Sequence, residues 1–335
     1  MPSKRQGCVA VARTATTAVV DTPKQYLMVE DGDTPLEPTT YKRKNNVNPF
    51  TVGMKHAGLV KRFSASNAEC DARQLGYLLW LFSGDAGYSR GSVEPNTDVH
   101  TIVPGTNGEY FTAFKYLAAA FITTDETVQV GGCRMSSLSL QQGSDAYAQV
   151  SCEAPGCVLG TMGALTPSLT LTDVLAPLNW HTLRAGGTAS GIKLGYNGAT
   201  QTEDGNITGF KLDLKWESNH GAKRLSTDDP SQILQGGMDV SFEVEREFGD
   251  AATAAEYLAW TTGQEIAITL KWLMSTYYVQ IEIPHAYVNA PVHGSIGVGA
   301  DAITARLSCE AFAYGADAVY TVTVKDGQTT DYSAL

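Results

Sequence analysis

The sequence predicts a mainly β protein built from two tandem β-sandwich or β-barrel units, each with one flanking α-helix and related by internal duplication. Two observations predict this class. Several segments alternate strictly between apolar and polar residues, and a set of landmark residues recurs in the same order in each half. Alternation with a period of two is typical of strands that bury one face. The 335 residues also suffice for two cores.

The repeat runs from Gly58 to Glu153 and returns from Gly237 to Glu310. Four landmarks match in order: 58–63 with 237–242, 77–80 with 257–260, 115–117 with 271–273, and 151–154 with 308–311. The alternative is that two β-rich halves resemble each other through composition alone. A chain that repeats one unit is typical of walls and rings, which need no single catalytic site.

Strict alternation is clearest in the second half. Residues 210–217 place apolar side chains at every second position with charged side chains between them, and residues 240–245 do the same. Residues 305–311 repeat this pattern, and residues 148–154 match them in the first half. Each segment therefore predicts a strand with one buried face and one solvated face.

Two segments show helical spacing instead, residues 71–82 and residues 251–260. Each is followed by a glycine, Gly84 or Gly263, the residue that most often closes a helix. The first has an apolar face that should lie across a sheet. The side chains on this face are Leu75, Leu78, Leu79 and Phe82. The Tyr-Leu-x-Trp pattern that both segments share is more typical of core packing than of a ligand site.

The repeat divides the chain into four segments. They are an N-terminal arm of residues 1–50, a first unit of 51–155, a linker of 156–205 and a second unit of 206–335. The arm is expected to be irregular apart from a strand at 26–29, and the linker to carry one or two strands. Only the first unit contains an insertion, residues 85–108. A loop of that length inside a compact domain is usually functional or disordered.

Composition limits the partners of the chain. The net charge is −11, and residues 168–335 hold most of the surplus, with 10 basic against 20 acidic residues. Such a protein is not suited to grip duplex DNA, although it can surround DNA without adsorbing it. The six cysteines form no CxxC pair and are expected to be buried thiols in a reducing cytoplasm. No export signal is expected, and the uncharged run 154–172 contains prolines that make a poor membrane helix.

A search for catalytic chemistry finds no candidate, so neither an enzyme nor a cofactor is predicted. The six histidines are scattered and show no metal-ligand spacing. The glycines of residues 294–299 lie between strand-like segments, whereas a nucleotide cradle needs them between a strand and a helix. The carboxylates Asp228 and Asp229 lie in an expected loop, and Glu243 and Glu245 lie on an expected polar strand face.

The order of strand, Tyr-Leu-x-Trp helix, insertion and paired strands resembles the tail tube (major tail) proteins of long-tailed bacteriophages. Residues 58–82, 110–153 and 207–214 carry the resemblance, together with their second-half counterparts. It implies tail-tube-like units in tandem-duplicated form, of the non-contractile, siphovirus-like kind. It also implies a structural virion protein that polymerises as stacked rings into the tail tube, the conduit for DNA ejection.

The same resemblance implies the partners. Tandem units form trimer rings with pseudo-six-fold symmetry, and a hexamer is the alternative here. Tape measure, terminator and distal tail proteins would be further partners, and duplex DNA would cross the lumen without specific binding; no membrane is implied. The protein would be assembled in the bacterial host cytoplasm and reside in the virion tail. The competing function is a tail-tip, decoration or receptor-binding β-sandwich module that forms no tube.

Two sets of residues are candidates for these roles. The insertion is expected to contact the next ring. Its candidate residues are Asp85, Tyr88, Arg90, Glu94, Asp98 and His100. One polar strand face in the second half, formed by Glu243, Glu245 and Glu247, is expected to face the lumen, where carboxylates would repel DNA.

Overall fold

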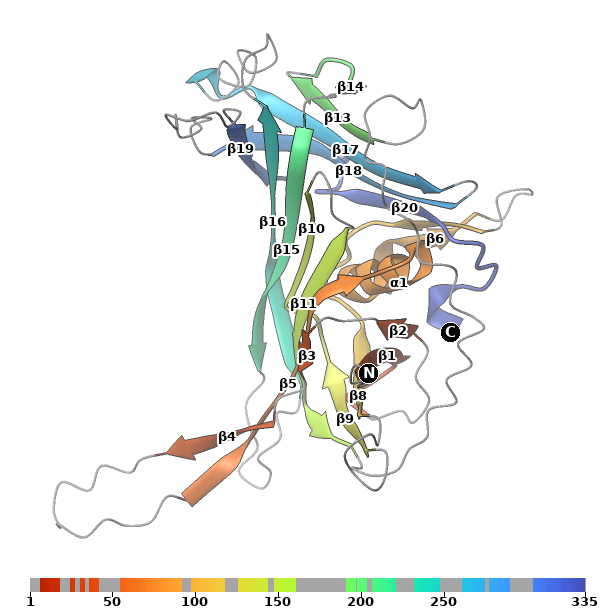
Figure 1. The fold of residues 1–335 in the computed structure, drawn as a ribbon, viewed down its shortest axis with the longest axis vertical. Helices are drawn as coiled ribbons and strands as arrows, with labels where there is room; N and C mark the ends of the chain where they lie inside the picture. The colour runs from red at the N-terminus through yellow and green to blue at the C-terminus, as the bar shows by residue number, and fades with distance from the viewer. Residues whose placement is uncertain are drawn as a thin grey trace, which may run out of the picture.

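The structure, a computed structural model, describes residues 7–18, 25–27, 31–33, 36–41, 55–91, 98–117, 126–143, 148–160, 191–196, 198–203, 207–220, 232–247, 261–274, 277–289 and 304–334. It is mainly β, as predicted, and its paired strands run antiparallel. The molecule is elongated, with its longest strands along the long axis (Figure 1).

The strands that run along this axis form one continuous surface, which we call the long-strand sheet because it contains the three longest strands, β5, β15 and β16. In order across the sheet, its strands are β5 (Lys55–Glu69), β11 (Gln149–Pro155), β10 (Ser137–Gly143), β15 (Ile207–His220), β16 (Ile233–Glu247) and β19 (Thr304–Ala311). The first three strands come from the first half of the chain and the last three from the second half. The two halves therefore share one sheet, joined where β10 pairs with β15.

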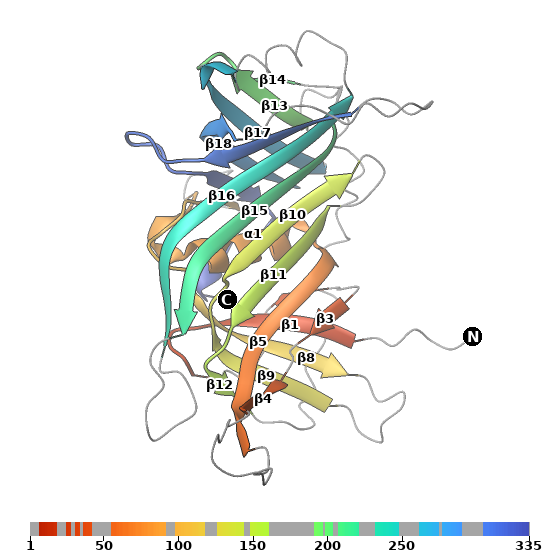
Figure 2. The same ribbon diagram turned by 90° about the vertical axis from the view of Figure 1, so that its left-hand side faces the viewer.

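Two further groups of strands cross the ends of the long-strand sheet (Figures 1 and 2). The group at the top of Figure 1 contains β6 (Tyr88–Arg90), β7 (Val99–Ile102), β13 (Gly191–Tyr196), β14 (Thr202–Glu203), β17 (Glu265–Met274), β18 (Tyr277–Val288) and β20 (Thr321–Lys325). The lower group contains β1 (Gly7–Thr14), β2 (Gln25–Leu27), β8 (Tyr110–Leu117), β9 (Glu126–Cys133) and β12 (Val158–Leu159). Two edge strands, β3 (Asp31–Asp33) and β4 (Leu36–Tyr41), pair only with β5 among the described residues, and the β4–β5 hairpin projects from the body.

The predicted alternation sets which face of the long-strand sheet is buried. Leu212 and Leu214 of β15 are buried, and Leu138 and Val240 lie beside Leu214 on the neighbouring strands. The register thus places apolar residues together on one face, which packs toward α1 and the crossing strands. If one strand slipped by one residue against its neighbour, its apolar side chains would move to the solvent face. Burial of the apolar face therefore excludes shifts by an odd number of residues, but not shifts by two.

The helix predicted over 71–82 is α1 (Ala72–Ser83). Asp71 caps it by accepting a hydrogen bond from the backbone of Gln74, and the Gln74 side chain accepts one from the Asp71 backbone. Gly84 closes it with φ of 85°, as its position predicts. Strands and the C-terminal segment surround the helix, so Trp80 is fully buried, which confirms core packing.

The second predicted helix, 251–260, lies outside the described residues. Thr261 and Thr262 are helical, and Gly263 follows with φ of 65°. Of the landmark tryptophans that are described, Trp216 and Trp272 are buried, in keeping with the core role expected of the periodic segments.

The N-terminal arm and the linker both contribute strands. β1 pairs with β8 along its whole length, and β2 adds to β1 where a strand was expected at 26–29. From the linker, β12 pairs with β9, and β13 pairs with β17. The boundaries of the four predicted segments stay predictions, although strands from the arm and the linker belong to the same sheets as the units.

The cysteines whose side chains the structure describes are buried and carry free thiols. They are Cys70, Cys133, Cys152, Cys157 and Cys309. Burial raises the pKa of the Cys152 thiol to about 12, so this thiol stays protonated and unreactive at neutral pH. Cys152 and Cys309 occupy matching positions on β11 and β19, where they act as small apolar residues in the core.

Candidate functional site

The outward face of the long-strand sheet is polar across its width. On each strand every second side chain points away from the core, and the register places these side chains in rows across the sheet. This face is turned toward the viewer in Figure 2. We call it the polar face, and its members are Ser137, Ser139, Gln141, Gln149, Ser151, Glu153, Lys211, Asp213, Lys215, Asp239, Ser241, Glu243, Glu245, Arg306, Ser308 and Glu310.

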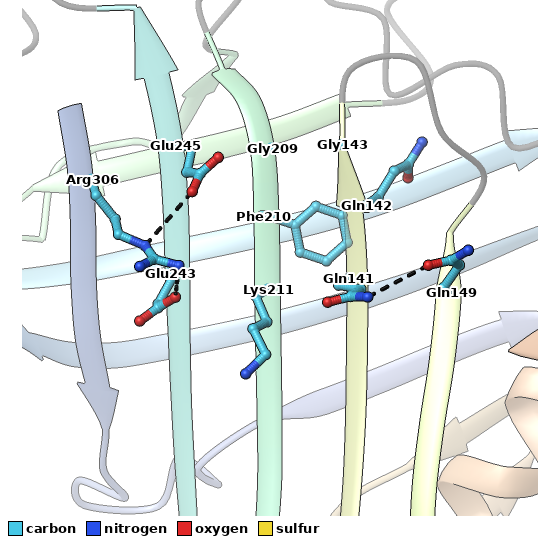
Figure 3. A pocket seen from close by; sticks show the side chains of 10 residues that line it. All are labelled: Gln141, Gln142, Gly143, Gln149, Gly209, Phe210, Lys211, Glu243, Glu245 and Arg306. Carbon is cyan, nitrogen blue, oxygen red and sulfur yellow. Dashed lines mark hydrogen bonds and ion pairs between the residues drawn. The ribbon is translucent and has the colours of Figure 1, made fainter. Parts of the chain in front are cut away.

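Carboxylates outnumber cations on the polar face, but several are paired. The two predicted lumen residues Glu243 and Glu245 both lie beside Arg306 (Figure 3). The Arg306 guanidinium is 2.6 Å from Glu243 and 3.7 Å from Glu245. Because these groups are largely exposed, the pairs contribute little to stability, yet they lower the local negative charge. Glu247 pairs with Thr304 in the ladder, and its side chain is outside the described residues.

A second ion pair lies on β15. Lys211 Nζ is 2.7 Å from Asp213 Oδ2. Partial burial alone would raise the pKa of Asp213, but hydrogen bonds from Lys211 and Ser139 outweigh it and lower the pKa below its ordinary value. Asp213 therefore keeps its negative charge to more acidic pH than a free aspartate. Glu153 and Glu310 extend the acidic surplus to the strands on either side.

A shallow hollow of about 220 Å³ opens on the polar face (Figure 3). Its floor is formed where Gly143 pairs with Gly209, two residues without side chains. Amide groups of Gln141 and Gln149 border one side, and the Arg306 cluster borders the other. These amides and paired ions offer hydrogen bonds and charge, but no nucleophile with an adjacent base. Among the described residues no group of His, Cys, Asp and Glu could hold a metal ion.

The insertion, where contact with the next ring was expected, is partly built into the body of the chain. Its strands β6 and β7 form a hairpin, and β7 pairs with β20 from the second half. His100 is fully buried, with Nδ1 2.7 Å from the Tyr88 hydroxyl and Nε2 3.3 Å from Asp326. Arg90 pairs with Asp331 at 2.6 Å. The side chains of Tyr88, Arg90 and His100 thus hold the C-terminal segment.

The other candidate residues of the insertion differ in position. Asp85 is exposed, although its carboxylate accepts a hydrogen bond from Trp80 Nε1. Asp98 is half-buried, 3.9 Å from the Lys325 ammonium. Glu94 lies outside the described residues. Contact of these insertion residues with the next ring stays a prediction.

Tyr332 is the centre of the C-terminal contact. Its ring is fully buried and stacks on His100 with centroids 4.3 Å apart. Its hydroxyl donates to Asp326 Oδ2 at 2.7 Å. Burial and the nearby Asp326 charge raise the pKa of Tyr332 well above its ordinary value, so the hydroxyl remains a donor. Sequence reasoning missed this cluster because its members are far apart in the chain.

An exposed aromatic cluster lies at the end of β18. Tyr287 is 45 % exposed and stacks on Phe312 at 4.4 Å, and Tyr314 is 64 % exposed. His285 lies beside them, with Nδ1 3.0 Å from Glu265 and Nε2 3.0 Å from Asp317. We call Tyr287, Phe312 and Tyr314 the aromatic cluster. The signal in the sequence was Tyr287 itself, a large aromatic residue that shares the polar side of its strand with His285 and Asn289.

His285 makes the segment after β19 sensitive to pH. Hydrogen bonds to Asp317 and then to Glu265 raise the pKa of His285 above its ordinary 6.5. The bridge therefore stabilises the fold below pH 6.5 and loses strength as pH rises through the higher folded pKa. Amide hydrogen exchange of residues 312–317, corrected for intrinsic rates, should accelerate as the pH rises above about 6.5. His285→Gln should remove this dependence; an equal acceleration in the variant would contradict the assignment.

Comparison of the sequence with known protein families gives a match over most of the chain. The sequence matches the family described as phage tail tube protein over residues 12–328. No curated protein matches the chain. Within the part of the chain that the structure describes, no helix has the length and apolar character needed to cross a membrane.

Proposed function

Because the chain belongs to the phage tail tube protein family, we propose that it polymerises as stacked rings into the tail tube and that its polar face lines the lumen. The observation that carries this proposal is the polar face itself. It is one continuous, solvated surface that crosses both halves of the chain and is backed everywhere by an apolar core. A ring of such sheets would enclose a polar bore.

Strand edges favour closure into a ring. The long-strand sheet ends at β3 and β4, whose outer edges have no partner among the described residues. Open edges of long sheets promote uncontrolled association unless they are paired or covered. Head-to-tail pairing around a closed ring removes them, since every edge then meets the next copy.

The charge of the polar face suits the passage of DNA. Unpaired carboxylates would repel the phosphate backbone, and the Arg306 and Lys211 pairs would keep the surface polar without strong positive sites. Glu243 and Glu245 remain lumen candidates on this basis, although Arg306 offsets their charge.

Trimer rings with pseudo-six-fold symmetry are supported by the way strands pair in the two halves. The strand pairs β1–β8, β8–β9 and β5–β11 of the first half correspond to β13–β17, β17–β18 and β16–β19 of the second. The registers agree when Lys115 is matched with Lys271 and Glu153 with Glu310, which offsets β5 from β16 by two residues relative to the sequence match. Lys115 pairs with Val128 as Lys271 pairs with Gln280, and Ser64 pairs with Glu153 as Ser241 pairs with Glu310.

Contacts between successive rings would come from parts that the body leaves exposed. Of the insertion, Asp85, which is exposed, is better placed for this than His100, which is buried. We propose the same virion partners that the resemblance implies: the tape measure, terminator and distal tail proteins of a siphovirus-like tail. As a structural virion protein in this scheme, the chain has no enzymatic role.

Negative-stain electron microscopy of purified protein tests the proposal. We expect rings or filaments with a central bore wide enough for duplex DNA, and three copies of the chain in each ring. Compact monomers at high protein concentration would overturn it. If such monomers bound cells or glycans, the tail-tip or receptor-binding alternative would be favoured instead.

A further inference from the structure

Within the long-strand sheet, the two halves of the chain meet at the strand pair of β10 with β15, which we call the internal junction. Leu138 of β10 lies opposite Leu214 of β15, and Ser139 lies opposite Asp213. Both leucines are buried, while Ser139 and Asp213 lie on the polar face and are hydrogen-bonded to each other. The internal junction therefore continues both the core and the polar face without a break.

The first half has a counterpart of β15, formed by β3 and β4 together. Both pair with the strand that follows them, β5 or β16, in the same register. The matching pairs are Asp33–Ser64 with Asp213–Ser241, Leu36–Lys61 with Trp216–Met238, and Thr40–His56 with His220–Ile233. Both ladders also contain an irregularity in this stretch, after Pro38 in one and after Trp216, the counterpart of Leu36, in the other. The edge of β15 that faces away from β16 pairs with β10. The corresponding edge of β3 and β4, which faces away from β5, pairs with no described strand.

The second half has a counterpart of β10, the end of β18. Tyr287 pairs with Glu310 as Ser137 pairs with Glu153. The Asn289 backbone donates to the Ser308 carbonyl at 3.0 Å, which gives Asn289 the position of Ser139. Beyond Tyr287, which pairs with Glu265 of β17, this edge has no partner among the described residues.

The aromatic cluster lies at this edge. Tyr287 holds the position of Ser137, and Phe312, which follows β19, holds that of Pro155. Two of the three exposed large hydrophobic residues in the described part of the chain, Tyr287 and Tyr314, belong to the cluster. Aromatic residues are enriched at the centres of protein interfaces, where a partner removes them from water.

We infer that the internal junction is repeated between neighbouring copies: the outer edge of β3 of one copy pairs with the end of β18 of the next copy, and the start of β4 then lies over the aromatic cluster of that copy. The inference rests on the proposed self-assembly. The correspondence places Asp33 of one copy opposite Asn289 of its neighbour, as Asp213 lies opposite Ser139. In a trimer, three internal and three intermolecular junctions would then alternate around the ring.

Paired cysteines test this register. Asp33→Cys and Asn289→Cys in one chain, oxidised after assembly, should link chains into covalent dimers and trimers. The matched control is Ser139→Cys with Asp213→Cys, which should link only within a chain and so run as a monomer on a denaturing gel. The five native cysteines whose side chains the structure describes are buried and should not interfere, and Cys8→Ser in every variant removes the sixth. Asp31→Cys with Asn289→Cys, two residues out of register, should link less.

A second measurement follows the aromatic cluster. Tyr287→Ser, which installs the residue found at the internal junction, should raise the protein concentration needed for ring formation by about tenfold or more. Tyr287→Phe keeps the ring and should leave that concentration nearly unchanged. Rings or tubes that form normally with Tyr287→Ser and show no chain-to-chain link between residues 33 and 289 would overturn the inference alone. Absence of rings in the unmodified protein would instead overturn the proposed function.

Discussion

Tyr332→Ala is expected to lower the free energy of unfolding by about 3–5 kcal/mol, the usual cost of truncating a buried aromatic residue. The ring is fully buried, and it contacts groups from both halves of the chain. It stacks on His100, and its edge meets Tyr77 of α1. Its loss would leave a cavity and remove the residue that fastens the C-terminal segment to the insertion hairpin. Urea-induced unfolding followed by tryptophan fluorescence measures the change.

The control is Tyr332→Phe, which keeps the ring and removes only the hydroxyl that donates to Asp326. Its expected cost is about 1–2 kcal/mol, because buried Asp326 loses one hydrogen-bond donor but keeps its contact with His100. Equal losses in the two variants would assign the stabilisation to the hydrogen bond. A loss below about 1 kcal/mol in Tyr332→Ala would show that the C-terminal segment is not fastened here.

Local periodicity was enough to predict four strands of the long-strand sheet, β11, β15, β16 and β19, and the position of α1. Alternation along β15 places Leu212 in the core and Lys211 on the polar face, and the structure confirms both. Helical spacing and Gly84 located α1 to within a residue or two. These features depend on near neighbours in the chain, so the sequence carries them directly.

Partners that are distant in the chain could not be predicted in this way. His100 and Tyr88 belong to an insertion whose composition is typical of an exposed loop. Both nevertheless pack against the C-terminal segment, because Asp326 and Tyr332 supply polar and aromatic contacts. Likewise, Glu243 and Glu245 were expected as free carboxylates. Arg306 reaches them only because β19 pairs with β16 in one particular register.

The limits of periodicity also appear in the alignment of the two halves. The sequence matches Phe63 with Phe242, but Phe63 pairs with Ala154 whereas Phe242 pairs with Cys309, the counterpart of Cys152. The alignment of β5 with β16 that the hydrogen-bond ladders give therefore differs by two residues from the alignment that the sequence gives. A shift of two leaves every side chain on the same face, so alternation cannot distinguish the two frames. Hydrogen-bond ladders can distinguish them, and the correspondence of β15 with β3 and β4 depends on that distinction.

The second large effect concerns DNA. If the polar face lines the lumen, as proposed, tubes of Glu153→Lys should retain duplex DNA that the unmodified tube releases. Glu153 is exposed, and its cross-strand neighbours are Ser64 and Ser137. The substitution therefore places a lysine between neutral side chains on a face that otherwise carries an acidic surplus. Repeated around every ring, these lysines would form a continuous line of cations along the path of the DNA.

Tubes assembled with short duplex DNA and then treated with nuclease measure this retention, because DNA inside the bore is protected. At low salt, Glu153→Lys should protect about tenfold more DNA than the unmodified tube, and the excess should fall steeply as salt rises. The matched control is Ala199→Lys with Thr202→Lys, which makes the same change in net charge at exposed positions beside and within β14, away from the polar face. Because bulk charge alone would act in both variants, equal protection in the control, or none in Glu153→Lys, would place the polar face outside the bore.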